Sequence, residues 1–149
     1  MLRVDINNAL KAAMKAGQAR RVSTLRLINA AILERETRGA ERVTLGDADI
    51  LDVMEKMIKQ RQESLDIYQK AGRAELAAQE REEIEIISAY LPERLSDLEA
   101  AEAISSMIKE IEAETLKDMG RTMAALKQRF SGRMDFSKAG ALVKKLLAG

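Results

Sequence analysis

The sequence predicts an all-α protein, and three observations lead to that prediction. The 149 residues include one proline and eight glycines, so long helices can run with few interruptions. Apolar residues recur at three- and four-residue spacing along most of the chain. Few segments show the alternating β-branched pattern of a strand. We therefore expect an N-terminal domain of about four helices, residues 1–91, followed by a three-helix tail domain, residues 92–149.

Apolar spacing predicts the four helices of the first domain at about 3–16, 20–38, 47–71 and 73–91. Gly17 is suited to end the first helix and Gly39 the second, because glycine adopts the left-handed conformation that closes many helices. Thr44 with Asp47 resembles a capping box ahead of the third helix. The buried stripe that we predict on the third helix consists of Ile50, Met54, Met57, Ile58, Leu65 and Tyr68.

The only proline, Pro92, predicts the domain boundary, since proline disfavours helical geometry at the residue before it. Ser96, with Glu99 three residues later, forms a capping box that starts the next helix. Asp135 is suited to cap the last helix, and Gly132 to end the one before it. The tail helices are predicted at about 97–113, 117–130 and 136–148.

Composition argues against several kinds of chemistry. The chain has no cysteine and no histidine, so thiolate sites and histidine general bases are excluded. No nucleophile elbow, phosphate-binding glycine loop or zinc motif occurs. We interpret Glu82, Glu83 and Glu85 as a solvated helix face, and we expect no catalytic residue, no metal and no cofactor. The N-terminus lacks the apolar core of a signal peptide and no apolar run could span a bilayer, so we expect a cytoplasmic protein without membrane contact.

Charge is distributed unevenly along the chain. Residues 1–91 hold 15 basic and 15 acidic side chains, residues 92–116 hold two and seven, and residues 117–149 hold eight and two. A second basic cluster occupies residues 1–26, with six basic side chains and one acidic. Either cluster can be a solubilising surface or a phosphate-binding surface. No row of aromatic side chains accompanies them, which disfavours single-strand stacking and leaves structured RNA as the nucleic-acid partner.

Three stretches follow one another along nearly the whole chain: LKAAMKAGQARRVSTLRLINAAI, IKQRQESLDIYQKAGRAELAAQEREEIEIISAYLPERLS and KDMGRTMAALKQRFSGRMD. In this order and spacing they resemble the YqeY proteins of bacteria. This GatB/YqeY-type family is similar to the C-terminal tail of the B subunit of the tRNA-dependent amidotransferase. The resemblance implies an all-helical fold whose tail grips tRNA while other domains perform the chemistry.

The resemblance also implies roles for residues of the tail. Lys117, Arg121 and Arg133 would contact RNA phosphate, and Lys138 on the last helix belongs to the same RNA-binding set. Gly120 and Gly132 would let the RNA approach the backbone closely. The residues implied as parts of the structural motif are Asp118, Met119, Met123 and Asp135, the two methionines through packing. After Arg133 the sequence reads MDFSK where the family pattern reads ADGK, so Phe136 replaces a glycine.

We therefore expect a non-catalytic tRNA-binding accessory module, with an aminoacyl-tRNA synthetase or an amidotransferase as a possible protein partner. One alternative is a protein–protein adaptor. Another is a component of a glutamine-dependent carbon–nitrogen ligase system, the activity that the resemblance to the amidotransferase implies. The sequence shows no site for the ATP, Mg²⁺ or ammonia source that such a ligase needs, and a shared domain does not establish shared catalysis.

Overall fold

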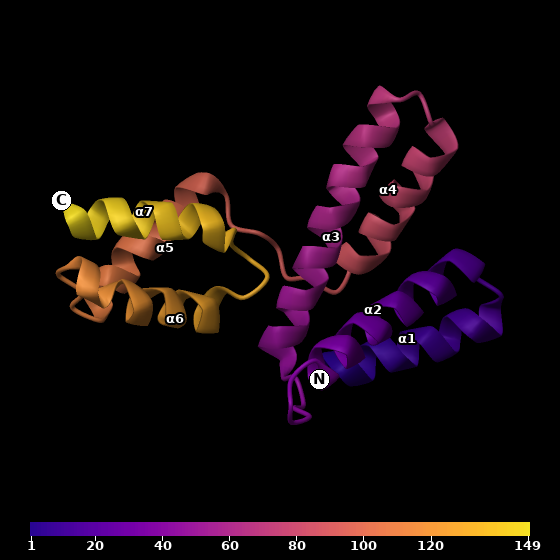
Figure 1. Ribbon diagram of the computed structural model, residues 1–149, viewed down its shortest axis with the longest axis horizontal. Coiled ribbons are helices and arrows are strands. Elements are labelled where there is room, and N and C mark those ends of the chain that lie inside the picture. The colour runs from indigo at the N-terminus through magenta and orange to yellow at the C-terminus, as the bar shows by residue number, and fades with distance from the viewer. The chain divides into compact units, whose positions relative to one another are not determined.

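The computed structural model describes all 149 residues, and it confirms the all-α prediction: the chain forms seven α-helices, one short 3-10 helix and no strand (Figure 1). The first four helices are α1 (Leu2–Ala16), α2 (Ala19–Thr37), α3 (Asp47–Lys70) and α4 (Ala74–Ser88). The others are α5 (Asp97–Glu110), the 3-10 helix Leu116–Asp118, α6 (Met119–Phe130) and α7 (Phe136–Ala148). None of them combines the length and the apolar character needed to cross a membrane.

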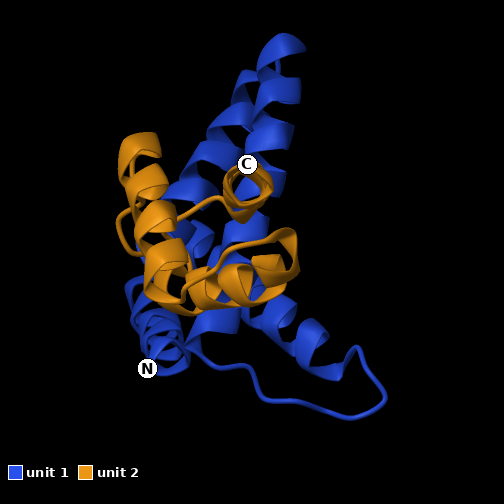
Figure 2. Ribbon diagram, turned by 90° about the vertical axis from the view of Figure 1, so that its left-hand side faces the viewer, with its two compact units in different colours: residues 1–91 blue, residues 92–149 orange.

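The helices group into two compact units, which Figure 2 shows in different colours. Unit 1 comprises residues 1–91 and unit 2 comprises residues 92–149. Each unit has its own apolar core, the first built on residues such as Leu25, Ile28 and Met54 and the second on residues such as Ile104 and Leu126. That each unit folds independently stays a prediction.

Unit 1 consists of the antiparallel pair α1–α2 and the longer hairpin α3–α4. Its core holds the first half of the stripe predicted on α3, where Ile50, Met54 and Met57 are buried. Ile58 and the residues that continue the stripe are only half-buried. The reason is that α1 and α2 cover the first half of α3, whereas α4 alone faces the second half (Figure 1).

Two carboxylates are buried among the helices of unit 1, and each is paired. Glu36 on α2 accepts a hydrogen bond from Arg3 Nη2 at 2.6 Å and from the Leu45 N–H at 2.9 Å. Glu83 on α4 accepts from Arg61 Nε of α3 at 2.9 Å. Burying a charge is costly unless it is paired, so these contacts let charged groups link neighbouring helices inside the unit.

Most of the predicted helix ends agree with the structure, and two do not. Gly39 follows the end of α2 at Thr37 but lacks the left-handed conformation expected of it. Gly17 closes α1 with a φ of 69°, and the Ser96 hydroxyl accepts from the Glu99 N–H at 3.1 Å in the predicted capping box of α5. The Thr44–Asp47 capping box was a wrong prediction, because Gly46 is the residue that precedes α3. The Asp47 carboxylate instead accepts from the Leu2 N–H at the start of α1, at 3.1 Å.

Candidate nucleic-acid interface

The methionine stripe of α6 packs against α7. Met119 and Met123 are half-buried beside the core of unit 2, and both side chains reach Gly140 on α7. A Cβ at Gly140 would lie 3.7 Å from Met123 Cε and 3.9 Å from Met119 Cε. The close contact between α6 and α7 therefore uses Gly140, with the flexible methionines filling the space that the glycine leaves.

The first turn of α6 holds the turn between α5 and α6 in place. The Asp118 carboxylate accepts from the N–H groups of Glu114 and Thr115, at 2.8 and 3.1 Å. Arg121 donates from Nη1 to the Ile111 carbonyl at 2.7 Å and from Nη2 to the Glu112 carbonyl at 3.2 Å. Arg121 thus satisfies two carbonyls that follow the end of α5, and Asp118 satisfies two N–H groups of the turn that precedes the 3-10 helix.

Asp118 and Arg121 also pair with each other, Arg121 Nε donating to Asp118 Oδ1 at 3.0 Å. The two backbone N–H groups and then the guanidinium lower the pKa of Asp118 from its usual range to about 2. Glu112 lies in the turn that this pair holds, and its φ of 53° is unfavourable for a residue other than glycine. The Asp118–Arg121 pair stabilises this turn, a role for Arg121 that the sequence did not predict.

A second turn joins α6 to α7 and involves Gly132 and Arg133. Gly132 is buried and has a φ of 75°, so its place in the turn requires glycine. Arg133 Nε donates to the Glu93 carbonyl at 3.1 Å, and the Arg133 carbonyl accepts from the Leu95 N–H at 2.8 Å. Arg133 therefore connects this turn to the segment that leads into α5.

Asp135 starts α7, as the sequence predicted, by accepting from the N–H groups of Ser137 and Lys138 at 2.9 and 3.3 Å. Phe136, which stands where the family pattern has glycine, is half-buried and packs against the core of unit 2. Lys138 projects from the first turn of α7 with its ammonium group unpaired.

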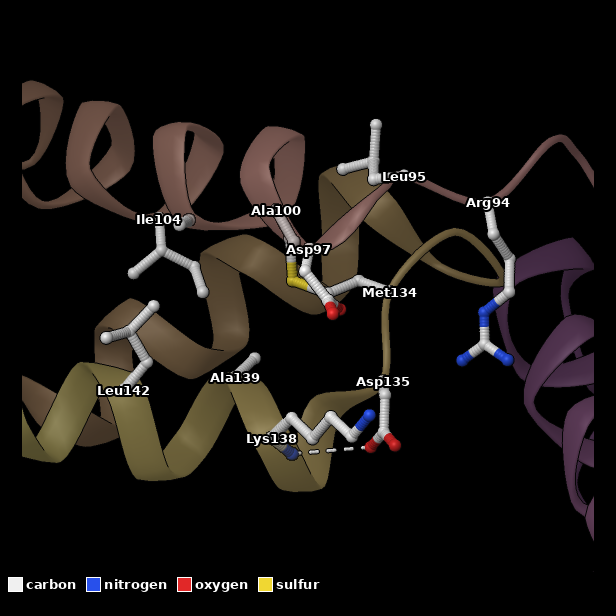
Figure 3. Close-up of a pocket in the computed structure, with 11 residues that line it drawn as sticks. Arg94, Leu95, Asp97, Ala100, Ile104, Met134, Asp135, Lys138, Ala139 and Leu142 are labelled. Atoms are coloured by element: carbon white, nitrogen blue, oxygen red, sulfur yellow. Dashed lines mark hydrogen bonds between the residues drawn. The ribbon is translucent and has the colours of Figure 1, made fainter.

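Lys138 lies at the mouth of a cavity of about 290 Å³ between α5 and α7 (Figure 3). The floor is apolar and includes Ile104, Ala139 and Leu142, whereas charged side chains such as Asp97 stand at the rim. Leu98 and Leu146, on the two helices that form this cavity, are 70% and 44% exposed. Unit 2 thus has an open apolar surface that the sequence did not predict.

The structure divides the predicted RNA-binding residues into two groups. Lys117, Gly120 and Arg121 lie at the start of α6, while Gly132, Arg133 and Lys138 follow its end. The 12 residues of α6 separate the groups by about 18 Å at 1.5 Å per residue. They lie at opposite ends of α6.

Arginine and lysine differ in unit 2. The guanidinium groups of Arg121 and Arg133 bond to backbone carbonyls, and Arg129 makes a two-bond pair with Glu110 at 2.7 and 2.8 Å. The lysines that are exposed and make no ion pair or side-chain hydrogen bond within the chain are Lys109, Lys117, Lys127, Lys138, Lys144 and Lys145. These six lysines make no contact of this kind within the chain, whereas the three arginines do.

Three of these lysines border the exposed side of the α6–α7 contact. Lys127 is four residues after Met123 and Lys144 four residues after Gly140, so each lies one turn from the point where the helices touch. The helices run antiparallel (Figure 1), which puts the two lysines about 12 Å apart along the axes. Lys117 lies just before the start of α6. The C-terminal half of α7 extends past that start, so Lys117 is at the same end of the helix pair as Lys144. We call Lys117, Gly120, Lys127 and Lys144 the α6–α7 face.

Gly120 is exposed in the first turn of α6, and a Cβ added there would meet no atom within 4 Å. No helix contact within the chain accounts for this glycine, although glycine in a helix costs about 1 kcal/mol relative to alanine. The sequence analysis did not identify Lys127 as a neighbour of Gly120. Lys127 is seven residues after Gly120, a spacing that places both on the same side of a helix and could have identified it.

In unit 1, the interpretation of the acidic run on α4 as a solvated face is wrong for Glu83, which is buried, whereas Glu82 and Glu85 are exposed. Glu82 pairs with Arg20 at 3.2 Å and Glu83 with Arg61 at 2.9 Å. No group of three or more acidic side chains is arranged to hold a metal ion.

Comparison with known proteins places the chain in a family. The model of the Yqey-like protein family matches residues 3–147, which is nearly the full length. An uncharacterised protein of the yeast Schizosaccharomyces pombe is 33% identical over 97 residues, covering 65% of this chain and 77% of the yeast protein. Similar proteins therefore occur outside bacteria. The chain belongs to the YqeY family.

Proposed function

We propose that this chain is a tRNA-binding accessory module whose α6–α7 face contacts the phosphate backbone. The supporting observation is the set of exposed lysines around the α6–α7 contact, which have no acidic partner in the chain. Ammonium groups on rigid helices are suited to phosphate, and such contacts are independent of base sequence. The proposal gives this chain the binding step and assigns the chemistry to a partner enzyme, an aminoacyl-tRNA synthetase or an amidotransferase.

The arginines have a different part in this proposal. Arg121 and Arg133 fix the two turns at the ends of α6 through backbone carbonyls. They thereby fix the direction of α6 and the position of Lys117. We propose that Lys117, Lys127 and Lys144 contact phosphate directly, and that Arg121 and Arg133 act first as positioning residues.

Gly120 fits the same proposal. Gly120 lies between Lys117 and Lys127 and has no side chain, so an RNA backbone can approach α6 closely at this point. The neighbouring exposed residue on this side of α6 is also small, Ala124. Long side chains there would hold a phosphate away from the two ammonium groups.

The test is fluorescence anisotropy of labelled tRNA with Lys127→Glu/Lys144→Glu and, as a matched control, Lys59→Glu/Lys70→Glu on α3. Both variants change the net charge by the same amount, and all four lysines are exposed. We expect the first to weaken binding by about tenfold at 0.1 M salt and to flatten its salt dependence. Equal affinity of the two variants would contradict the α6–α7 face as the site.

One observation favours the protein adaptor as a second function. The cavity between α5 and α7 has apolar lining residues of the kind that bind protein side chains, and Leu98 and Leu146 are exposed elsewhere on the same two helices. Pull-down from a lysate with and without nuclease distinguishes the two functions. A protein partner that is retained after nuclease treatment, and lost on Leu142→Glu, would support the adaptor.

A further inference from the structure

Unit 1 is electrically neutral as a whole, yet its charges are separated. Residues 1–33 hold six basic side chains and one acidic, whereas residues 34–91 hold nine and 14. The first group corresponds to α1 and most of α2. Residues 1–33 therefore have a net charge of +5, and the whole α1–α2 pair, which also includes Glu34, Arg35 and Glu36, has a net charge of +4 that the remainder of the unit compensates.

Internal pairs neutralise only part of this positive charge. Arg3 bonds to Glu36, and Arg20 bonds to Glu82 of α4. Arg21 is half-buried and lines a cavity with Glu82 and Glu85. The remaining cations are Lys11, Lys15 and Arg26, which are exposed and make no ion pair or side-chain hydrogen bond within the chain.

A side-chain hydrogen bond shows where two of these cations lie. Asn29 Nδ2 of α2 donates to Asn7 Oδ1 of α1 at 3.0 Å, which marks one side of the helix pair. Lys11 is four residues after Asn7 and Arg26 three residues before Asn29, so both share that side. Because the helices are antiparallel, both cations lie on the α1–α2 turn side of this hydrogen bond. Lys11 is about 6 Å from Asn7 along α1, and Arg26 is about 4.5 Å from Asn29 along α2.

Lys11 and Arg26 are therefore neighbours at nearly the same height on helices whose axes lie about 8–10 Å apart. Lys15 follows one turn after Lys11 on the same helix. Asp5, the one carboxylate of the first 33 residues, is two positions from Asn7 and so points to another side of α1. Two like charges side by side without a carboxylate repel each other, and an anion between them relieves that repulsion.

We propose that Lys11 and Arg26, with Lys15 beside them, form a second phosphate-binding surface for structured RNA on α1–α2. This inference rests on the proposed function and extends it to unit 1. The lysine supplies a mobile ammonium group and the arginine a planar fork that can contact two oxygens of one phosphate. The amides of Asn7 and Asn29 add uncharged hydrogen-bonding groups to the same surface.

The experiment is anisotropy of labelled tRNA with the full-length Lys11→Glu/Arg26→Glu variant at several salt concentrations. The matched control is Lys59→Glu/Arg73→Glu, which makes the same charge change at exposed positions on α3 and before α4. We expect the first variant to bind about tenfold more weakly at 0.1 M salt and to lower the salt slope by about 1.5, corresponding to two lost contacts. The neutral variant Lys11→Gln/Arg26→Gln should have a smaller effect in the same direction, with unchanged helix content.

The outcomes separate this inference from the proposed function. If Lys11→Glu/Arg26→Glu binds like its control while Lys127→Glu/Lys144→Glu binds weakly, the α1–α2 surface is wrong and the α6–α7 face stands. If the wild-type chain does not bind tRNA at low salt, both proposals are wrong. If only the α1–α2 variant weakens binding, the inference stands and the α6–α7 face is wrong.

Discussion

The two units use charged side chains in different ways. In unit 1, Glu36 and Glu83 are buried and their arginine partners tie one helix to another. Unit 2 buries no charged side chain; Arg121 and Arg133 bond to turns, Arg129 bonds to a surface glutamate, and the lysines are exposed. The comparison teaches that a similar proportion of charged residues can link helices inside one unit and leave unpaired lysines on the surface of the other. Substitutions should therefore act on stability in unit 1 and on binding in unit 2.

The largest effect should come from Leu126→Ala in the core of unit 2. Leu126 is fully buried, and its truncation leaves a cavity that costs about 3 kcal/mol. A unit of 58 residues has little stability to spare, so unit 2 of the variant should unfold at a much lower urea concentration. Both tyrosines, Tyr68 and Tyr90, belong to unit 1, so their fluorescence should keep its midpoint while far-UV circular dichroism falls early. A joint shift of both signals would show that the units unfold as one.

Glu83→Ala should have the next largest effect and lower the free energy of unfolding of unit 1 by about 3 kcal/mol. It leaves the Arg61 guanidinium, only 13% exposed, without its partner in the protein interior. Tyrosine fluorescence during urea unfolding measures the loss. Glu34→Ala is the control, because the Glu34–Arg38 pair is exposed on both sides and should leave the midpoint unchanged. Equal effects of the two substitutions would contradict the role of the buried pair.

The Asp118–Arg121 pair should make unit 2 sensitive to acid. Since folding lowers the pKa of Asp118 to about 2, its contribution to stability is complete above about pH 4 and is lost as the pH falls toward 2. Thermal melting of the wild type and of Asp118→Asn at several pH values measures this contribution as a difference. The midpoints should differ at neutral pH and converge in acid. A constant difference from pH 6 to pH 2 would contradict the assignment.

Gly120→Ala should have the smallest effect on stability and, unlike the substitutions above, should increase it. No atom of the chain lies near the added methyl group, so alanine should stabilise α6 by about 0.5–1 kcal/mol. If the RNA backbone approaches at this point, the same variant should bind tRNA more weakly. A stabilised variant with unchanged affinity would remove Gly120 from the proposed interface.

The sequence predicted the helices well because their signals are local. Apolar spacing, the Ser96–Glu99 capping box and Asp135 all act within a few residues of one another, so neighbouring letters contain the information. The Thr44–Asp47 box failed for a non-local reason, since Asp47 bonds instead to Leu2 at the start of the chain. The half-exposed end of α3 was missed likewise, because spacing alone does not tell which helices cover it.

The candidate site was less predictable, and Arg121 shows why. A helical wheel correctly puts its Cα on the side of α6 opposite the methionine stripe, but a long side chain can turn back to satisfy carbonyls. Those carbonyls belong to Ile111 and Glu112, just after the end of α5, which are ten and nine residues away in sequence. Lysines lack the fork geometry that would hold them to such a turn, and in unit 2 they remain exposed. Which cations are open to a ligand depends on these tertiary contacts.

The most direct test of this division of roles compares Arg121→Gln with Lys127→Gln. Each removes one positive charge from α6, and each variant is assayed for its melting temperature and for its affinity for labelled tRNA. Our account predicts that Arg121→Gln lowers the melting temperature of unit 2, and that Lys127→Gln keeps the wild-type melting temperature but weakens tRNA binding. The contrary result, Arg121→Gln weakening tRNA binding at an unchanged melting temperature while Lys127→Gln binds normally, would contradict it.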